Sequence, residues 1–547
     1  TKNNERQVKF EWESDDNQAL FLAGSASLGF AKSRSATSVA GGVSLSLNDV
    51  GLTTDARIHN VDLQGFNNDR TGDVKVMADD KSRLSAIGGV VEFSRTEGGG
   101  YGVGLGGMSA LNYAESTVAA QITDSSVQAT SVDVSATSTP HLNAYAIAGA
   151  VVIGDPLFSV SGAFALNRLR RDVTAQIAGQ ADDKVSATAN NINPNWGTNT
   201  SNDKGIAVRV LDQPHLRAVS AGAAIAFTTG RQQTFAATIG AAVSHNELDQ
   251  QTAGNGAVAR IEGVTIVAPD VDLLAEAVSE PTLIATSVPL GVLGERGKVG
   301  VNIAGALSFN RLRGEVAAQV NAASLDGGGL EILADYRPDV RAKTFEVAFS
   351  SVFSAATTTS IVVGVTWTWN KDEVKTWATL GDATSSDKKN LSVTGDVVVQ
   401  AFRQPCDSSD STAMYASHSL GSTINIVAGN QGAVGLEYLG MFAYNSVEGD
   451  VTATLRAIKF TKDAASVTVE AVDLSTIHAT AFGLSVGFSG SSAGFAWTLA
   501  PITQVAANFE SSVVKARVQD SDLKVSGNTT VRATKTPYLH ASSRGVQ

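Results

Sequence analysis

The feature that most constrains the fold of this chain is an internal repeat. An asparagine recurs after an alternating apolar segment, in contexts such as ALNRL, SFNRL and AYNSV. The eight copies are Asn48, Asn112, Asn167, Asn246, Asn310, Asn370, Asn445 and Asn508. Their intervals run from 55 to 79 residues and average about 66, a period typical of a supersecondary unit that is stacked many times.

Prolines supply a second marker with the same period. Six of the 11 prolines follow strand-like segments such as VDVSATST and VRVLDQ. They are Pro140, Pro214, Pro281, Pro338, Pro405 and Pro537. Because proline fixes φ and has no N–H to donate to a β-ladder, these positions are predicted to be corners.

The asparagines are predicted to mark another corner. Asparagine tolerates the left-handed region and can bond its own backbone, so each is expected to close a strand and open a turn. In stacked coils, identical asparagine side chains could also form a hydrogen-bonded ladder.

Each repeat is predicted to contain four strands. One stretch shows all four: a V-x-V-x-A strand at 132–136, an Ala/Gly-rich strand at 142–152 after the proline corner, its partner at 158–167 that ends at the asparagine, and a V-x-A-x-I strand at 172–177, which a polar loop follows. Apolar residues alternate with period 2 and glycine is frequent, which favours strand over helix. The Ala/Gly-rich strand and its partner flank short turns rich in Gly and Pro.

The fold class expected from these patterns is all-β. Aromatic residues make up only 6% of the 547 residues, so small and β-branched side chains must fill a closely packed core. One repeat cannot bury its own faces, so we expect residues 1–547 to form a single quasi-continuous, elongated β-solenoid of about eight repeats. Both ends resemble interior repeats, so the chain is expected to be a segment of a longer one. Stacked antiparallel hairpins remain an alternative, because a hairpin and a β-arch read alike in sequence.

Composition excludes several classes of protein. The net charge is −12, which argues against a nucleic-acid-binding protein. A single cysteine in the chain rules out a disulfide scaffold. The sequence lacks an uninterrupted apolar stretch of the length that a membrane helix needs, so we expect no transmembrane segment.

Candidate chemical sites are sparse. The seven histidines lack the spacing of metal ligands, and Cys406 is expected to be a free thiol. Acidic loops could bind calcium, but the G-G-x-G-x-D pattern of calcium-binding repeats is absent. We therefore predict no catalytic, metal or cofactor residue. Three N-x-S/T sequons are candidate glycosylation sites: Asn199, Asn390 and Asn528.

The repeat motif resembles a known family. The order N-x5-V-x-A-x-I, V-x-V-x-A and A-x-A-x-A-G is similar to the repeats of giant bacterial surface proteins, the filamentous-haemagglutinin-like and leukotoxin-type filamentous adhesins. The best copies are 167–177, 310–320 and 132–150. This resemblance implies secretion, a long β-rod on the cell surface, and a role in adhesion or an extracellular matrix.

The function expected is a non-catalytic structural segment of a large secreted or cell-surface protein, an adhesin stalk or extracellular fibre. Its partners would be flanking repeats of the same chain, other copies in a fibre, and an unidentified glycan or protein receptor. A self-assembling filament or sheath subunit is the first alternative. The second is a polysaccharide-active β-helix enzyme. Such enzymes gather aromatic residues along one groove, whereas the tryptophans of this chain do not recur at the repeat period.

Overall fold

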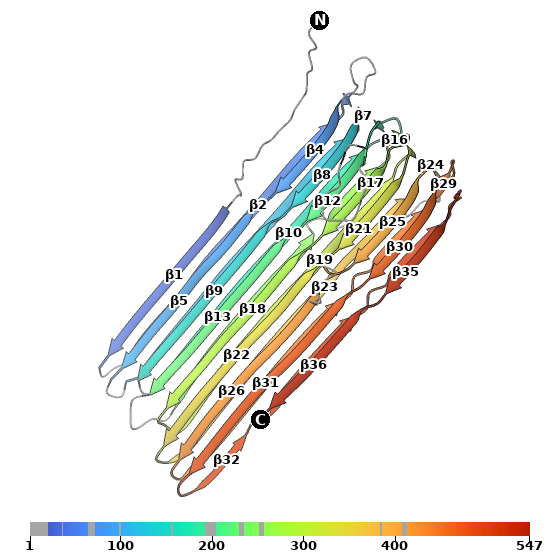
Figure 1. Cartoon of the computed structure of the whole chain (residues 1–547). Coiled ribbons are helices and arrows are strands. Elements are labelled where there is room, and N and C mark those ends of the chain that lie inside the picture. The colour runs from blue at the N-terminus through green and yellow to red at the C-terminus, as the bar shows by residue number, and fades with distance from the viewer. Residues whose placement is uncertain are drawn as a thin grey trace.

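The computed structural model describes residues 20–34, 37–63, 72–97, 100–154, 157–190, 192, 204–228, 235–250, 256–382, 386–406 and 413–547. They form a β-solenoid of four sheets, which we name A to D (Figure 1). Each coil passes through sheets A, B, C and D in turn and then enters sheet A of the next coil.

Sheet A has nine strands. They are β1 (Leu20–Ser33), β5 (Arg83–Thr96), β9 (His141–Gly154), β13 (His215–Thr228), β18 (Thr282–Glu295), β22 (Asp339–Ser354), β26 (Tyr415–Gly429), β31 (Thr476–Ser491) and β36 (Tyr538–Val546).

Sheet B has twelve strands, because in several coils its strand is divided into two or three shorter strands. They are β2 (Ser38–His59), β6 (Gly102–Thr123), β10 (Leu157–Ala178), β14 (Ala236–Gln250), β15 (Ala257–Glu262), β19 (Val299–Asn321), β23 (Thr357–Gly381), β27 (Gly432–Val447), β28 (Val451–Arg456), β32 (Phe495–Leu499), β33 (Ile502–Glu510) and β34 (Val514–Gln519).

Sheet C has seven short strands. They are β3 (Asp62–Leu63), β7 (Ser126–Gln128), β11 (Lys184–Ser186), β16 (Thr265–Ala268), β20 (Ser324–Gly327), β24 (Lys389–Val393) and β29 (Ile458–Phe460). Sheet D has eight strands. They are β4 (Asp73–Asp80), β8 (Ser131–Ser138), β12 (Ile206–Asp212), β17 (Leu273–Ser279), β21 (Leu330–Tyr336), β25 (Asp396–Arg403), β30 (Ser466–Asp473) and β35 (Thr529–Lys535).

Strand pairing confirms the β-solenoid and shows that the hairpin alternative is wrong. Every pairing between the named strands is parallel and joins equivalent residues of successive coils. Sheets A and B of one coil therefore form a β-arch and meet through side chains. Within the described residues, the one antiparallel bridge is isolated, between Ile192 and Lys204.

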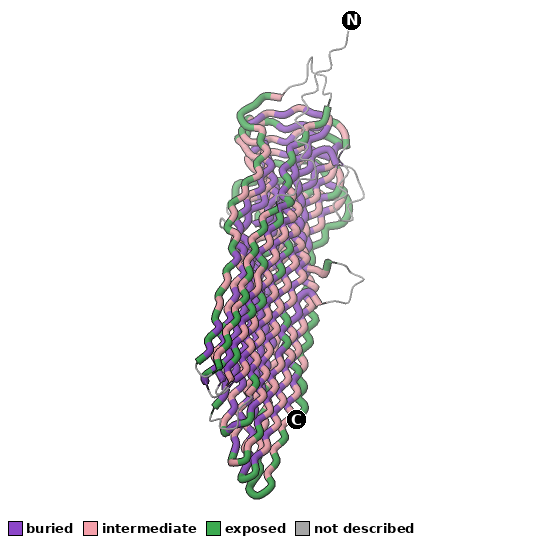
Figure 2. The backbone as a smooth tube through the Cα atoms, turned by 90° about the vertical axis from the view of Figure 1, so that its left-hand side faces the viewer, coloured by how far each residue is buried: buried purple, intermediate pink, exposed green. Residues whose placement is uncertain are grey.

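One repeat makes one coil. At about 4.8 Å per strand the nine strands of sheet A stack to roughly 38 Å, whereas a 22-residue strand such as β10 extends roughly 73 Å. The long dimension of the described segment thus lies along its strands and not along the stacking axis, as Figure 1 shows. Figure 2 shows the segment from the side of its first strands, with buried residues along this length.

The interior has two parts with different chemistry. The second half of sheet B, together with sheets C and D, encloses a large core of Val, Leu, Ile and Ala. Sheet A and the first half of sheet B form a thinner two-layer arm, which encloses a smaller apolar cluster made mostly of alanine. We refer to this two-layer region as the arm.

The prediction that the eight asparagines close strands is wrong. Each lies inside a strand of sheet B; Asn167 is an interior residue of β10, and Asn310 of β19. The segments predicted as two strands, 158–167 and 172–177, are one continuous strand. The cause is that the asparagine side chain points inward and finds its partners there, so the backbone stays extended.

The left-handed corner occurs twelve residues further on, where sheet B gives way to sheet C. Asn60, Asp124, Ala457 and Asp520 have φ between 47° and 56°. These residues form the left-handed turn that the sequence predicts at the repeated asparagines. The short strands of sheet C follow this corner, within the segments predicted to be polar loops.

The prolines lie at the junction between sheets D and A. Pro140 stands between β8 and β9, and Pro281 between β17 and β18. Pro214, Pro338, Pro405 and Pro537 follow β12, β21, β25 and β35 in the same way. The carbonyl oxygens of Pro140 and Pro214 accept hydrogen bonds of 2.8 and 2.9 Å from the next coil. This corner therefore uses the carbonyl acceptor of proline and does not need the N–H donor that proline lacks.

Candidate functional site: the asparagine ladder and the corner network

The eight asparagines form one continuous ladder through the molecule. Each Nδ2 donates to Oδ1 of the asparagine in the next coil, and the seven N···O distances lie between 2.8 and 2.9 Å. The six residues from Asn112 to Asn445 are 0–2% exposed. Because every buried amide is shared between two coils, the ladder fixes the register of the stack.

The ladder also joins the two layers of the arm. The second Nδ2 proton of Asn112 is donated to the carbonyl oxygen of Asn143 in sheet A, at 2.7 Å. Asn445 donates in the same way to the carbonyl oxygen of His478, at 2.8 Å. A hydrophobic residue at these positions would leave buried carbonyl and amide groups unpaired.

On the outer face of sheet B, charged residues follow the asparagines. We define the charge belt as the residues one and three positions after each asparagine, such as Arg311, Arg313, Lys371 and Glu373. Glu373 accepts from Arg313 at 2.7 Å and Lys371 at 2.9 Å, and it pairs with Arg311 at 3.1 Å. The belt thus links neighbouring coils by ion pairs on the surface of sheet B.

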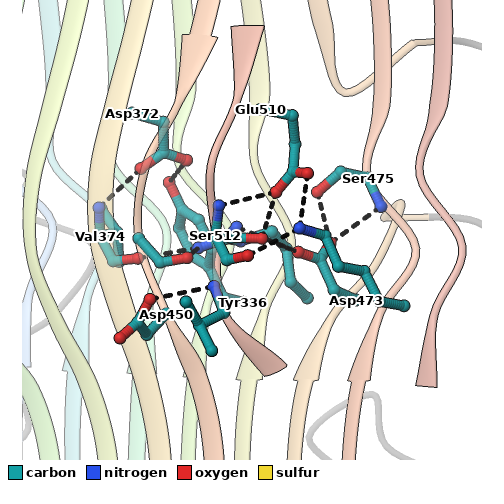
Figure 3. A network of polar contacts seen from close by, with 12 residues as sticks. Tyr336, Asp372, Val374, Asp450, Asp473, Ser475, Glu510 and Ser512 are labelled. Atoms are coloured by element: carbon teal, nitrogen blue, oxygen red, sulfur yellow. Dashed lines mark hydrogen bonds and ion pairs between the residues drawn. The ribbon is translucent and has the colours of Figure 1, made fainter. Parts of the chain in front are cut away.

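A buried polar cluster occupies the corner where sheets D, A and B meet (Figure 3). We define the corner network as Tyr336, Asp372, Arg403, Tyr415 and Asp473, each at most 1% exposed. Asp372 accepts from Tyr336 at 2.9 Å, from the N–H of Val374 at 2.8 Å, and from Tyr415. Burial raises the pKa of Asp372, although Arg403 and these hydrogen bonds lower it.

Arg403 is the cation of this network. Its guanidinium lies 3.3 Å from Asp473 and donates to the carbonyl oxygens of Val374 and Gly449 at 2.9 and 2.7 Å. Asp473 also accepts from Ser475 and Ser512. The polar groups of the corner network therefore bind mainly one another, although Nε of Arg403 has no hydrogen-bond partner. The network is closed to solvent, which suits a structural role better than a substrate site.

The same position is polar in other coils. In sheet D it is occupied by Asp212, which pairs with Arg171 of sheet B and accepts from Ser279 at 2.8 Å. Ser116 donates to the equivalent Asp80 at 2.8 Å. The sequence pattern does not reveal this corner network, because the residue type of its sheet D members changes from coil to coil. Those members, Tyr336, Arg403 and Asp473, each lie two residues before the proline position.

Buried glutamates line the interior of the arm. Glu346 is fully buried, and neither of its carboxyl oxygens has a hydrogen-bond partner. Glycines make room for it: a Cβ placed on Gly364 would lie 2.4 Å from its Oε2. Burial raises the pKa of Glu346 well above its ordinary value, so the neutral acid is the form that the fold accommodates.

Glu346→Gln is expected to remove a pH-dependent loss of stability. A raised pKa in the folded state means that the fold holds a proton that the unfolded chain releases above about pH 4.5. Stability is therefore retained below that pH and falls by about 1.4 kcal/mol per pH unit up to the raised pKa. Urea midpoints at pH 5 and pH 8 should show the variant gaining on the wild type at pH 8. Glu448→Gln in the charge belt is the control, and an equal gain at both pH values for E346Q would contradict this assignment.

Two of the histidines stack on each other between successive coils. The rings of His141 and His215 stack with centroids 4.6 Å apart, one coil above the other, on the outer side of sheet A. Partial burial lowers the pKa of both side chains, and their proximity lowers that of His141 further. Among the described residues there is no group of three or more His, Cys, Asp or Glu side chains placed to hold a metal ion.

The remaining candidate residues lie apart from these networks. Asn390 is an exposed residue of β24, and Asn528 is exposed just before β35, whereas Asn199 falls outside the described residues. The Cys406 thiol lies 3.0 Å from the carbonyl oxygen of Arg337. Partial burial, helped by Glu280 and Asp339, raises its pKa to about 11, so the thiol is protonated at neutral pH.

The fold and these networks define a parallel β-solenoid stabilised by internal polar ladders. No family model, curated protein or solved structure matches this chain. In the part of the chain that the structure describes, no helix is long and apolar enough to span a membrane.

Proposed function

We propose that this chain is a non-catalytic structural segment of a large secreted or cell-surface β-repeat protein, serving as an adhesin stalk or extracellular fibre. The observation that carries this proposal is the uninterrupted asparagine ladder, which joins every coil from β2 to β33. A ladder of this kind serves the stack as a whole and offers nothing to a substrate.

The corner network and the charge belt support the same reading. Their charged side chains bind one another, from neighbouring coils and from different sheets. The interior therefore uses its polar groups to hold the coils in register, as expected of a stiff scaffold that presents its loops and faces.

Immunolabelling of cells that carry the native gene tests the proposal. Antibodies against the purified segment should label intact cells as strongly as permeabilised cells, while an antibody against a cytosolic protein should label only the latter. Labelling that requires permeabilisation would contradict a surface location. Release of sugars from a panel of polysaccharides by the purified chain would favour the enzyme alternative instead.

A further inference from the structure

The two outer faces of the arm have unexpected chemistry. In sheet A, the outward residues nearest the turn into sheet B are apolar or small; in β9 they are Ile147, Gly149, Val151 and Ile153. The equivalent residues of β5, β13, β18, β22, β26 and β31 contain no Asp, Glu, Lys or Arg except Arg95 at the edge in β5, which pairs with Glu97. We call this surface face A; its Ile147 and Phe345 are 57% and 51% exposed.

Sheet B presents a similar surface on the opposite side of the arm. The outward residues of β19 before the asparagine are Val301, Ile303, Gly305, Leu307 and Phe309. The equivalent positions of β6, β10, β14, β23 and β27 also lack charged residues, and the charge belt begins directly beyond them. We call this surface face B; its Leu105 and Trp367 are 43% and 41% exposed.

The interior between these faces combines its alanine-rich apolar cluster with buried polar side chains. Ser220 and Ser244 hydrogen-bond there at 2.9 Å, Thr238 donates to Asn302 at 2.7 Å, and Glu346 is buried. A sheet with one face in water normally places its polar side chains outward. The apolar, largely uncharged outer faces of the arm depart from this rule, which makes them candidate contact surfaces.

The size of the faces fits a protein partner. Seven strands of sheet A, from β5 to β31, at about 4.8 Å each, and seven residues at about 3.3 Å each, give face A a footprint of roughly 800 Å². A stable protein interface needs roughly 800 Å² from each partner.

The shapes of the two faces fit each other. Face A carries a ridge with one large apolar side chain in each coil: Phe93, Val151, Ile225, Val292, Phe349 and Ile424. Face B carries a column in which four of six consecutive coils have glycine: Gly107, Gly162, Ala241, Gly305, Val365 and Gly440. Ridge and column repeat with the same rise per coil, so a ridge can lie along the whole column.

The charges agree with the same placement. Seating Ile225 on Ala241 brings Arg217, eight residues before Ile225, over Asp249, eight residues after Ala241, because the strands of sheets A and B run in opposite directions. Seating Phe349 on Val365 in the same way brings Arg341 near Glu373, which already pairs with Arg311, Arg313 and Lys371, so this coil adds no charge match of its own. The placement that seats the ridge on the glycines therefore also brings one pair of opposite charges together, Arg217 and Asp249, while Val365 is the one large residue in the column.

We propose that face A of one copy of this chain packs on face B of a second copy, with the ridge seated on the small-residue column. Because the two faces differ, each bound copy still presents one free face. The contact is heterologous and open-ended, so copies assemble side by side into a laminate. This contact goes beyond the proposed scaffold role and would hold wherever the protein is located.

Filling the column tests the proposal without adding charge. A Cβ on Gly162 meets nothing within 4 Å, and one on Gly305 meets only a backbone oxygen at 3.9 Å, so the fold should accept Gly162→Leu and Gly305→Leu. Sedimentation velocity should show the wild type associating with rising concentration, and the double variant should need at least tenfold higher concentration. Gly51→Leu, in the charge belt of β2 with open space around it, is the control and should behave as the wild type.

A mixing experiment tests the heterologous geometry. Ile225→Lys with Phe349→Lys should break the ridge and leave the column intact, and circular dichroism should verify that both double variants remain folded. At concentrations where the wild type polymerises, neither double variant should do so alone, but an equimolar mixture should form dimers, because one copy retains the ridge and the other the column. Failure of the mixture to form dimers would overturn the proposal.

Two other results would also overturn it. If the Gly162→Leu, Gly305→Leu variant associates as tightly as the wild type, the contact is nonspecific or lies at the open sheet edges. If the wild type stays monomeric at all concentrations but floats with phosphatidylcholine vesicles, the faces bind lipid and not a second copy.

Discussion

Asn310→Leu is expected to destabilise the solenoid by about 2–5 kcal/mol. Asn310 accepts from Asn246 and donates to Asn370, both at 2.9 Å, in the middle of the ladder. Leucine has a similar volume but leaves the Nδ2 group of Asn246 and the Oδ1 atom of Asn370 without this partner in a dry interior. Unpaired buried groups cost more than the net value of the lost hydrogen bond. Urea unfolding followed by circular dichroism measures the effect.

The end of the ladder offers a matched control. Asn508 is the acceptor in the last step of the ladder and is only half-buried. In Asn508→Leu, the Nδ2 group of Asn445 keeps its bond to the carbonyl oxygen of His478, so the expected loss is below about 1 kcal/mol. Equal losses for N310L and N508L would show that the ladder stabilises through volume alone.

Periodicity made most of the fold predictable. Alternation identified the strands of sheets A and D, and the prolines marked the junction between them, because both depend on rules local to a few residues. Whether each short turn joined a hairpin or a β-arch was not predictable. That difference depends on whether the backbone of β9 pairs with β10 or with β13, and the same alternating sequence satisfies both.

The asparagine markers show where local reasoning fails. Asn167 has the composition of a turn residue, but its partners Asn112 and Asn246 are 55 and 79 residues away in sequence. The hydrogen bonds that Asn167 makes to both neighbouring coils outweigh its turn propensity, because these bonds are made from an extended strand. The repetition of asparagine at one phase was itself the signal of a ladder.

The corner network was beyond sequence analysis for a related reason. Tyr336, Arg403 and Asp473 occupy one column of sheet D but belong to different residue types. No repeated letter marks them, and only stacking brings them together with Asp372 and Tyr415. Buried polar groups of different residue types that complement each other across coils leave no periodic trace in the sequence, unlike the identical asparagines of the ladder.

Arg403→Met is expected to be the most damaging substitution in the corner network, with a loss of about 3–5 kcal/mol. Methionine fills part of the volume but leaves Asp473 without its cation and the carbonyl oxygens of Val374 and Gly449 without the donor that now serves both. Asp473→Asn in the same chain should recover part of the loss, because it removes the unpaired charge. The urea midpoints of the wild type, the two single variants and the double variant measure this coupling.

An exposed ion pair tests whether burial, and not charge pairing alone, causes the expected loss of stability in Arg403→Met. Lys388 and Asp522 pair at 2.6 Å but are 39% and 56% exposed, so Lys388→Met is expected to cost less than about 1 kcal/mol. The contrast follows from desolvation: Asp522 regains water when its partner is removed, whereas Asp473 is sealed behind Ser475 and Ser512. A loss in R403M as small as that in K388M would mean that water reaches the corner network, and its structural assignment would then be wrong.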